Sequence, residues 1–348
     1  MGRKGGEVLE PARRVRLEDV AADVGVSTAS VSLVLRGVPG PSAATREKVL
    51  AAATRLGYRP DRAASLLAAR RSRLIGVMLD VHSSFHAELV TDLLETVEQH
   101  GYDLVLSTIT RHRGEQRAVE TLLDSRCEAL VLLGPEAPAE RLAELDRRLP
   151  VVVVGRRLGD PGVDVVRVAD DDGVGQAVAH LVGLGHRDIA YLDGGSGTIA
   201  AIRRDGYLTA MHADGLPTNV LAGGMDEEAG TAAGAVLLAA GRLPTAVVAY
   251  NDRSAVGLMD SFVRAGVDVP GQVSVVGYDD DLVARLAHIG LTTISQDTGR
   301  LTEHAMALLV ERLDGGRTEH REVVLPPRLV VRTTTAAPRS TAPGPTQA

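Results

Sequence analysis

The spacing of apolar residues changes character near residue 74. From residue 17 to about residue 69, apolar residues recur at helical spacing, which predicts three or four short helices. Beyond that point, short apolar runs such as LIGVMLD and PVVVVG alternate with amphipathic stretches. Strands that are apolar on both faces and alternate with helices are typical of a parallel sheet with helices on both sides.

The alternating region holds two series of such elements. The predicted helices lie near 86–100, 114–125 and 138–148 in the first series, and near 173–185, 200–214 and 253–265 in the second. Two series of this kind predict two doubly wound α/β subdomains with a cleft between them.

Residues 16–37 have the pattern of a helix-turn-helix. The inward-facing apolar positions are Leu17, Val20, Ala21 and Val24 in the first helix and Val31, Val34 and Leu35 in the second. Gly25 suits the left-handed turn between the helices, and Ser27 is placed to cap the second. In a helix-turn-helix the second helix enters the major groove of DNA. A three-helix bundle with no role in DNA binding would show the same pattern, so the pattern alone leaves both readings open.

The charge distribution fits the DNA-binding reading, and a solvated charged face would account for it equally well. The net charge is −7, yet residues 1–73 contain 14 Lys and Arg against 7 Asp and Glu, which leaves a net charge of −14 for the rest. A basic segment joined to an acidic body is typical of a nucleic-acid-binding domain fused to another module.

Other sequence features exclude several classes of protein. The chain has no apolar run long enough to span a membrane, and residues 1–6 lack the apolar core of a secretory signal. Its single cysteine, Cys127, offers neither an intramolecular disulfide nor a metal cluster, and His82, His86 and His186 lack metal-ligand spacing. We therefore expect a cytoplasmic protein without a metal or cofactor.

The segment from Asp19 to Pro60, DVAADVGVSTASVSLVLRGVPGPSAATREKVLAAATRLGYRP, strongly resembles the DNA-binding head of the lactose-repressor (LacI/GalR) family. The resemblance continues through 61–77 and along the core to about residue 332. It implies an all-α helix-turn-helix head, a hinge helix, and a core with the periplasmic-binding-protein fold. The expected regions are a flexible basic arm (1–15), the helix-turn-helix domain (16–60), a hinge (61–73), an effector-binding and dimerisation core (74–332) and a disordered Pro/Thr/Ala-rich tail (333–348).

The resemblance also implies which residues meet DNA. Thr28, Ala29 and Leu33 match operator-reading positions, whereas Ser27, Thr45, Arg46 and Tyr58 match positions that meet the phosphate backbone. Leu67, with Ala64 beside it, matches a leucine that relatives insert between base pairs from the minor groove. The predicted set is completed by Arg16, Leu17, Ser32 and Arg62.

Two of these positions depart from the family pattern. Leu33 stands where many relatives carry a polar or basic side chain, and leucine makes only apolar contact with a base edge. Arg16 replaces the hydroxyl residue that usually caps the first helix, so a cap is lost and a phosphate-binding cation gained. The operator sequence is therefore not readable from relatives.

Polar residues follow the predicted core strands, where open α/β sheets bind ligands. Those taken as effector-binding are Asp80, Arg156, Asn251, Asp279 and Gln296. The resemblance adds Arg203, at the start of an RxxGY motif, and Phe85, an aromatic that lines the pocket in relatives. Asn251 and Asp279 could instead be helix caps or loop hydrogen-bonding residues. The glycine-rich segment 193–198 could cradle a phosphate or form a flexible cleft loop.

This side-chain set suits a polyhydroxylated ligand, because each desolvated hydroxyl needs a donor or an acceptor. A carbohydrate is the first hypothesis, and a nucleoside or purine is the alternative because the chain is poor in aromatic residues. We expect a homodimeric repressor on a near-palindromic operator, controlled allosterically by this effector. Two rivals are a solute-binding protein, disfavoured by the DNA-binding head, and an enzyme, for which no catalytic motif is present.

Overall fold

The computed structural model describes residues 15–35, 37–58, 71–159 and 162–339. The chain divides into two compact units, Met1–Ser72 and Arg73–Ala348. Most of the predicted hinge, with Arg62, Ala64 and Leu67, lies outside the described residues.

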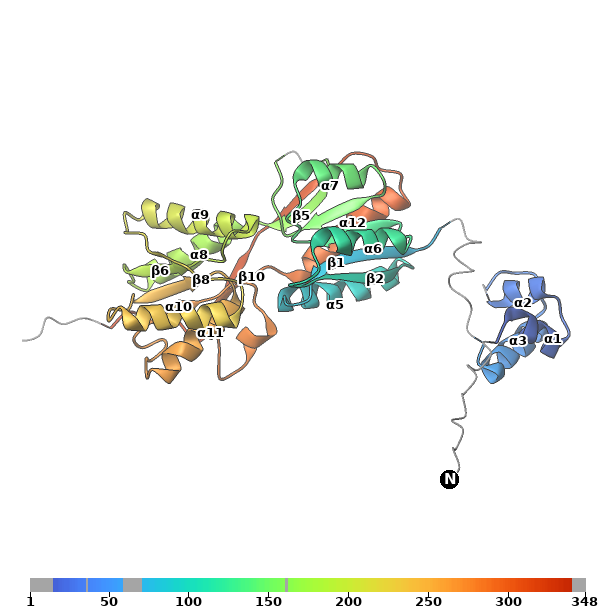
Figure 1. Cartoon of the computed structure of the whole chain (residues 1–348), viewed down its shortest axis with the longest axis horizontal. Helices are drawn as coiled ribbons and strands as arrows, with labels where there is room; N and C mark the ends of the chain where they lie inside the picture. The colour runs from blue at the N-terminus through green and yellow to red at the C-terminus, as the bar shows by residue number, and fades with distance from the viewer. Residues whose placement is uncertain (1–14, 36, 59–70, 160–161, 340–348) are drawn as a thin grey trace, which may run out of the picture. The chain divides into compact units, whose positions relative to one another are not determined.

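The first unit is a three-helix head built from α1 (Leu17–Val24), α2 (Thr28–Leu35) and α3 (Ala43–Leu56) (Figure 1). Its core takes one fully buried valine from each helix, Val20, Val31 and Val49. Helix α1 ends at Gly25, whose φ of 72° is left-handed, and the hydroxyl of Ser27 accepts the N–H of Ser30 at 3.2 Å. The predicted helix-turn-helix, with its turn and its cap, is confirmed.

The second unit begins with a six-stranded sheet in the order β11-β5-β4-β3-β1-β2, in which every pairing is parallel. The strands are β1 (Leu74–Asp80), β2 (Asp103–Ile109), β3 (Ala129–Leu133), β4 (Val151–Val154), β5 (Asp164–Val168) and β11 (Glu322–Leu325). Helices α5 (Ser84–Gln99) and α12 (Thr298–Leu313) share one apolar cluster with the sheet, whereas α6 (Glu115–Asp124) and α7 (Ala139–Asp146) share another. The sheet is therefore covered on both faces, as predicted.

The second subdomain has a parallel sheet in the order β7-β6-β8-β9. Its strands are β6 (Ile189–Leu192), β7 (Val220–Leu221), β8 (Ala246–Ala249) and β9 (Ser274–Val276). Helices α8 (Asp170–Gly183) and α9 (Thr198–Ala213) form one apolar cluster with this sheet, and α10 (Glu227–Ala239) and α11 (Asp252–Arg264) form another. Helix α10 is absent from the sequence prediction.

The chain crosses between the subdomains three times (Figure 1). The crossings follow β5, follow β10 (Thr293–Ser295), and join β11 to β12 (Arg328–Val330). Strands β10 and β12 pair antiparallel beside the second subdomain, and a short 3-10 helix, η1 (Leu282–Arg285), precedes β10. These crossings give the two-lobed core that the periplasmic-binding-protein resemblance implies.

The predicted disordered tail is wrong for its first residues. The backbone N–H of Val275 donates to the carbonyl of Thr334 at 2.8 Å, and the Thr334 hydroxyl donates to the carbonyl of Val275 at 2.7 Å. Thr334 is only 2% exposed. A Pro/Thr/Ala-rich composition does not prevent a segment from pairing with a strand whose edge is free, and β9 offers such an edge. The rest of the tail, from residue 340, lies outside the described residues.

Candidate effector cleft and nucleic-acid interface

The operator-reading positions predicted from the sequence lie along α2. Thr28 and Ala29 are exposed, whereas Ser32 and Leu33 are half-buried. Leu33 reaches toward the loop after α2, because a Cβ at Gly40 would lie 3.7 Å from Leu33 Cδ1. Thr28 and Ala29 are thus the freest of these four side chains to meet a base, and their contact with DNA stays a prediction.

The residues expected to meet phosphates already stabilise the head. Arg46 donates to the carbonyls of Val34 and Val38, at 3.5 and 3.0 Å, and so ties α3 to the end of α2. The Thr45 hydroxyl lies 2.9 Å from that of Ser42, which caps α3. Two further residues, Leu17 and Tyr58, pack against the head core.

Arg16 is exposed at the start of α1 and supplies no side-chain cap. Asp19 compensates in part, because its carboxylate accepts the N–H of Arg16 at 2.7 Å. The lost cap predicted at this position is therefore confirmed, and the guanidinium of Arg16 is exposed to solvent.

Arg203 is buried on α9 of the second subdomain. Its Nε donates to Asp170 Oδ1 at 2.8 Å, and one terminal nitrogen donates to the carbonyl of Tyr250 at 2.8 Å. The other terminal nitrogen lies 3.5 Å from Asp279 Oδ1, which also accepts from the side chain of Gln296 at 2.7 Å. The structure thus joins three predicted residues, Arg203, Asp279 and Gln296, in one network.

The RxxGY motif explains how Arg203 reaches this position. A Cβ on Gly206 would lie 2.8 Å from the backbone of Asp171, so only glycine lets α9 approach the start of α8, which carries Asp170. The hydroxyl of Tyr207 donates to the carbonyl of Ile189 at 2.8 Å and fixes α9 to β6.

Burial sets the ionisation of this network. Burial raises the pKa of Asp279 to about 7, although the Arg203 charge and the Gln296 hydrogen bond oppose the rise. Burial alone would lower the pKa of Arg203, but the adjacent Asp170 and Asp279 carboxylates raise it well above its usual range. The Arg203 guanidinium also lies 3.6 Å from the ring centroid of Tyr278. Arg203 is therefore a permanent cation that aromatic and acidic groups surround.

Asn251 is a helix cap, one of the two readings left open by the sequence. Its carbonyl oxygen accepts the N–H of Ser254 at 2.9 Å at the start of α11, and its amide donates to the carbonyl of Met225 at 2.9 Å. Both polar groups of the side chain are engaged, so its effector contact stays a prediction that the geometry does not favour.

The first subdomain carries two more of the predicted effector residues, Asp80 and Phe85. Asp80 ends β1, and its carboxylate accepts the N–H of His82 at 2.9 Å. The N–H of Asp80 donates to His86 Nδ1 at 3.0 Å, and burial lowers the pKa of His86 to about 4, so that nitrogen is an acceptor at neutral pH. Phe85 is half-buried beside His86. Asp80 and Phe85 thus lie on either side of the short loop between β1 and α5.

Arg156 does not join the Arg203 network. One of its terminal nitrogens donates to the carbonyls of Pro135 and Ala137, at 2.7 and 2.6 Å. Both carbonyls belong to the loop between β3 and α7. Arg156 therefore organises a neighbouring loop of its own subdomain, and its predicted effector contact has no support from the described geometry.

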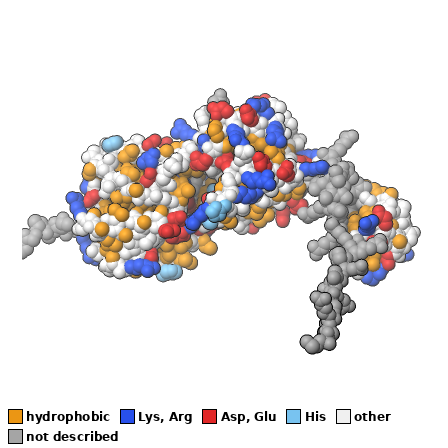
Figure 2. Space-filling model, in the orientation of Figure 1, with side chains coloured by type: hydrophobic (Ala, Val, Ile, Leu, Met, Phe, Trp, Pro, Cys, Tyr) orange, Lys and Arg blue, Asp and Glu red, His pale blue; other side chains and the backbone are white. Residues whose placement is uncertain are grey.

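Sequence reasoning missed the contacts that join the two lobes of the core. Ser84 donates to the carboxylate of Asp281, and Arg253 donates to the carbonyl of His82. The carboxylate of Glu136 accepts from the N–H and the hydroxyl of Thr198, the latter at 2.9 Å. These residues follow no motif, although their places soon after strand ends, in loops or first helical turns, were a signal. Figure 2 shows charged side chains gathered where the two lobes meet.

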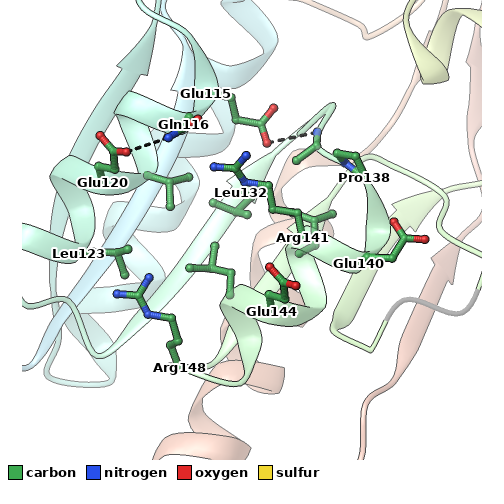
Figure 3. Close-up of a pocket in the computed structure, with 14 residues that line it drawn as sticks. Glu115, Gln116, Glu120, Leu123, Leu132, Pro138, Glu140, Arg141, Glu144 and Arg148 are labelled. Atoms are coloured by element: carbon green, nitrogen blue, oxygen red, sulfur yellow. Dashed lines mark hydrogen bonds between the residues drawn. The ribbon is translucent and has the colours of Figure 1, made fainter.

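A separate groove of about 680 Å³ lies between α6 and α7 on the first subdomain (Figure 3). Apolar residues such as Leu123, Leu132 and Leu145 line it, with Glu and Arg side chains along its rim. None of the predicted effector residues lines this groove. Within the described ranges, no helix is long and apolar enough to cross a membrane, and no group of three or more acidic, histidine or cysteine side chains could hold a metal.

A helix-turn-helix head joined to a two-lobed core with a buried polar network defines the class of ligand-responsive DNA-binding regulators. Comparison with known proteins agrees with this class. The profile of bacterial regulatory proteins of the lacI family matches residues 16–61, and that of the periplasmic binding protein-like domain matches residues 178–335. The chain belongs to the lacI family of bacterial transcriptional regulators.

Two curated relatives span nearly the whole chain. The transcriptional regulator GalR of Escherichia coli (strain K12) is 34% identical over 331 residues, which cover 92% of this chain and 96% of GalR. The repressor PurR of Vibrio parahaemolyticus is 30% identical over 326 residues, which cover 91% of this chain and 98% of PurR.

Solved structures give the same result. A LacI transcriptional regulator from a Rhodococcus species is 42% identical with a TM-score of 0.72, and the match covers 76% of this chain and 98% of that one. The lac repressor dimer bound to operator and the anti-inducer ONPF is 30% identical with a TM-score of 0.81, covering 93% and 100%. A CelR–cellobiose complex is 30% identical with a TM-score of 0.68, covering 92% and 100%.

Proposed function

We propose that this regulator binds a near-palindromic operator as a homodimer, and that a carbohydrate in the cleft controls its operator affinity. The observation that carries the effector assignment is the network of Arg203, Asp279 and Gln296, which joins three residues predicted from strand ends and the RxxGY motif. Carboxylate, amide and guanidinium groups can each pair with a hydroxyl, and one aromatic ring offers an apolar face to a sugar. The solved CelR complex contains cellobiose, which supports this class of ligand.

The dimer follows from the head. One recognition helix reads about half of an operator, and each chain carries one such head, so a two-fold pair is needed for a complete site. The lac repressor relative binds its operator as a dimer. The proposal assigns no catalytic step to the chain and, because its target is chromosomal DNA, places it in the cytoplasm.

A gel-shift experiment with DNA from upstream of the protein's own gene tests the proposal. We expect a neutral sugar in a panel of mono- and disaccharides to change operator affinity. Gln296→Ala should shift the effector midpoint at least tenfold, which is about 1.4 kcal/mol, while operator affinity without effector is retained. Gln116→Ala, an exposed glutamine on α6, is the matched control.

An unchanged midpoint in Gln296→Ala would show that the cleft network does not bind the effector. A response to nucleobases and to none of the sugars would leave the assignment as a ligand-controlled regulator standing. It would replace a carbohydrate by a purine-type ligand, in line with the similarity to PurR. Protection of a single half-site by a monomer would overturn the dimer.

A further inference from the structure

The loop that carries Glu136 is held rigidly on its own subdomain. Arg156 donates to the carbonyls on both sides of Glu136, those of Pro135 and Ala137. The carboxylate of Glu115 accepts the N–H of Glu136 at 2.9 Å and that of Ala137 at 3.3 Å, the second of which is drawn in Figure 3. With its backbone fixed from two sides, Glu136 projects its side chain in a defined direction.

That side chain ends on the opposite subdomain, at the first turn of α9. The two oxygens of Glu136 lie 3.3 and 3.4 Å from the N–H of Thr198, and one lies 2.9 Å from its hydroxyl. The cap residue, Gly197, supplies no side-chain cap of its own, and a Cβ there would lie 3.3 Å from Glu136 Oε1. The first turn of a helix favours a negative group, and in this chain Glu136 supplies it.

The same turn of α9 also lies close to the first subdomain. A Cβ on Gly134 would lie 3.6 Å from His86 Nε2 and 3.9 Å from Ile199 Cδ1. Ile199 belongs to α9, whereas Gly134 and His86 belong to the other lobe. The Glu136 contact is therefore part of a packed junction between the lobes, next to His86 at the start of α5.

The cations at the cleft walls already have partners. Arg203 is shared by Asp170 and Asp279, and Arg204 pairs with Asp193 at 2.8 Å. Arg253 pairs with Glu227, and Arg285 lies 3.5 Å from Glu88. Among the described residues that follow the strands at the cleft, Arg157 is an exposed cation for which no ion pair is found.

We propose that Glu136 is a selectivity residue that makes the cleft close on uncharged ligands and reject anionic ones. Its carboxylate occupies the electropositive first turn of α9, where an anionic group of a ligand would otherwise gain most. A sugar phosphate carries a charge of about −1.5 to −2 at neutral pH, and it would meet the carboxylates of Glu136 and Asp80 with few cations free to compensate. This inference rests on the proposed effector cleft.

Matched ligand pairs test the selectivity on the full-length chain by calorimetry and by thermal shift. The probes are glucose and glucose 6-phosphate, fructose and fructose 1-phosphate, and trehalose and trehalose 6-phosphate. In any pair of which a member binds, we expect the neutral sugar to bind and the phosphate to have a dissociation constant at least tenfold higher. Glu136→Gln should reduce the ratio of the two dissociation constants. Glu140 is an exposed glutamate on α7, and Glu140→Gln should leave this ratio unchanged.

A phosphate that binds as tightly as its neutral partner would overturn the inference, and so would an unchanged ratio in Glu136→Gln. If a sugar phosphate does bind that tightly, loss of its binding in Arg157→Ala would identify Arg157 as the cation that holds the phosphate. These results leave the proposed function standing, because that function fails only if a bound sugar does not change operator affinity.

A second measurement decides the case in which none of these sugars binds. Spin labels on Asp124 of α6 and Asp205 of α9, in a Cys127→Ala background, report the distance between the lobes. Glu136→Ala should lengthen or broaden the distance distribution, and Glu140→Ala should leave it unchanged. If Glu136→Ala has no effect on the distribution, Glu136 does not hold the lobes together and the inference is wrong.

Discussion

Replacing Arg203 by methionine removes one positive charge from the core while keeping most of the side-chain volume. The side chains of Arg203 and Asp170 are each 5% exposed, and that of Asp279 is 13% exposed. The replacement removes the 2.8 Å hydrogen bond that Asp170 accepts from Arg203 and the one that the carbonyl of Tyr250 accepts. Asp279 keeps its bond from Gln296 at 2.7 Å.

The magnitude follows from what remains buried. Removing one partner of a buried ion pair costs about 3–5 kcal/mol, because the other charge stays in a medium of low polarity. Burial already raises the pKa of Asp279 to about 7, so that carboxyl can take up a proton at little cost near neutral pH. The destabilisation therefore comes mainly from Asp170, whose carboxylate is left buried without its cation. We expect the unfolding free energy of the core to fall by about 3–5 kcal/mol.

Urea unfolding of the full chain, followed by far-UV circular dichroism, measures this loss in the core transition. Arg204→Met is the control, because Arg204 is half-exposed, pairs with Asp193 on the same lobe, and should cost less than about 1 kcal/mol. Adding Asp170→Asn to Arg203→Met should recover at least half of the loss. A loss below about 1 kcal/mol, or no recovery in the double variant, would refute the argument from the unpaired carboxylate.

Three further outcomes follow from the structure and the hinge hypothesis. Because the pKa of Asp279 is raised to about 7, the folded state binds a proton more tightly than the unfolded state. This stability is fully present below about pH 4, is lost as the pH rises through 7, and amounts to at most about 4 kcal/mol. Asp279→Asn should flatten the dependence of Tm on pH between 4 and 8, and an unchanged slope would contradict the assignment. Gly230→Ala should destabilise the core by more than about 1–3 kcal/mol, because the new Cβ would lie 2.0 Å from the carbonyl oxygen of Ser254. In the same urea unfolding assay Gly183→Ala should be tolerated, because a Cβ at Gly183 meets nothing within 4 Å. Leu67→Ala should weaken operator binding while leaving the salt-dependent affinity for random DNA intact, and equal losses on both DNAs would reduce the hinge to a tether.

The elements that the sequence predicted well are those with a strong pattern. Strands such as VVVV at 151–154 are apolar throughout because both faces of the sheet are covered, and this pattern is hard to confuse with a surface helix. Helix α10 was missed because alanine and glycine dominate it and give little contrast between its faces. The same small residues let it pack closely on α11, as the contact between Gly230 and Ser254 demonstrates.

The candidate site was predicted in part. The rule that ligands bind beyond strand ends, together with the RxxGY motif, found Arg203, Asp279 and Gln296, and the structure joins them. The same rule did not distinguish Arg156, whose guanidinium turns to carbonyls of the neighbouring loop. A strand-end position fixes where a residue lies along the chain, but its side-chain direction depends on partners far away in sequence. Glu136 and Thr198, which are 62 positions apart, were unpredictable for that reason.

The contacts between the lobes and the effector act on the same equilibrium. Glu136 with Thr198, and Ser84 with Asp281, exist only when the lobes are close, and each hydrogen bond to a charged group contributes about 1.5–3 kcal/mol. An effector that contacts both lobes stabilises the same closed arrangement. It can shift the population only as far as its affinities for the closed and open forms differ. Opening the lobes by Glu136→Ala and closing them with effector must therefore change operator affinity in opposite directions, whether the closed form binds DNA or releases it. Operator titrations of both variants at Glu136, with and without effector, test this relation, and a shift in the same direction would separate lobe closure from control of DNA binding.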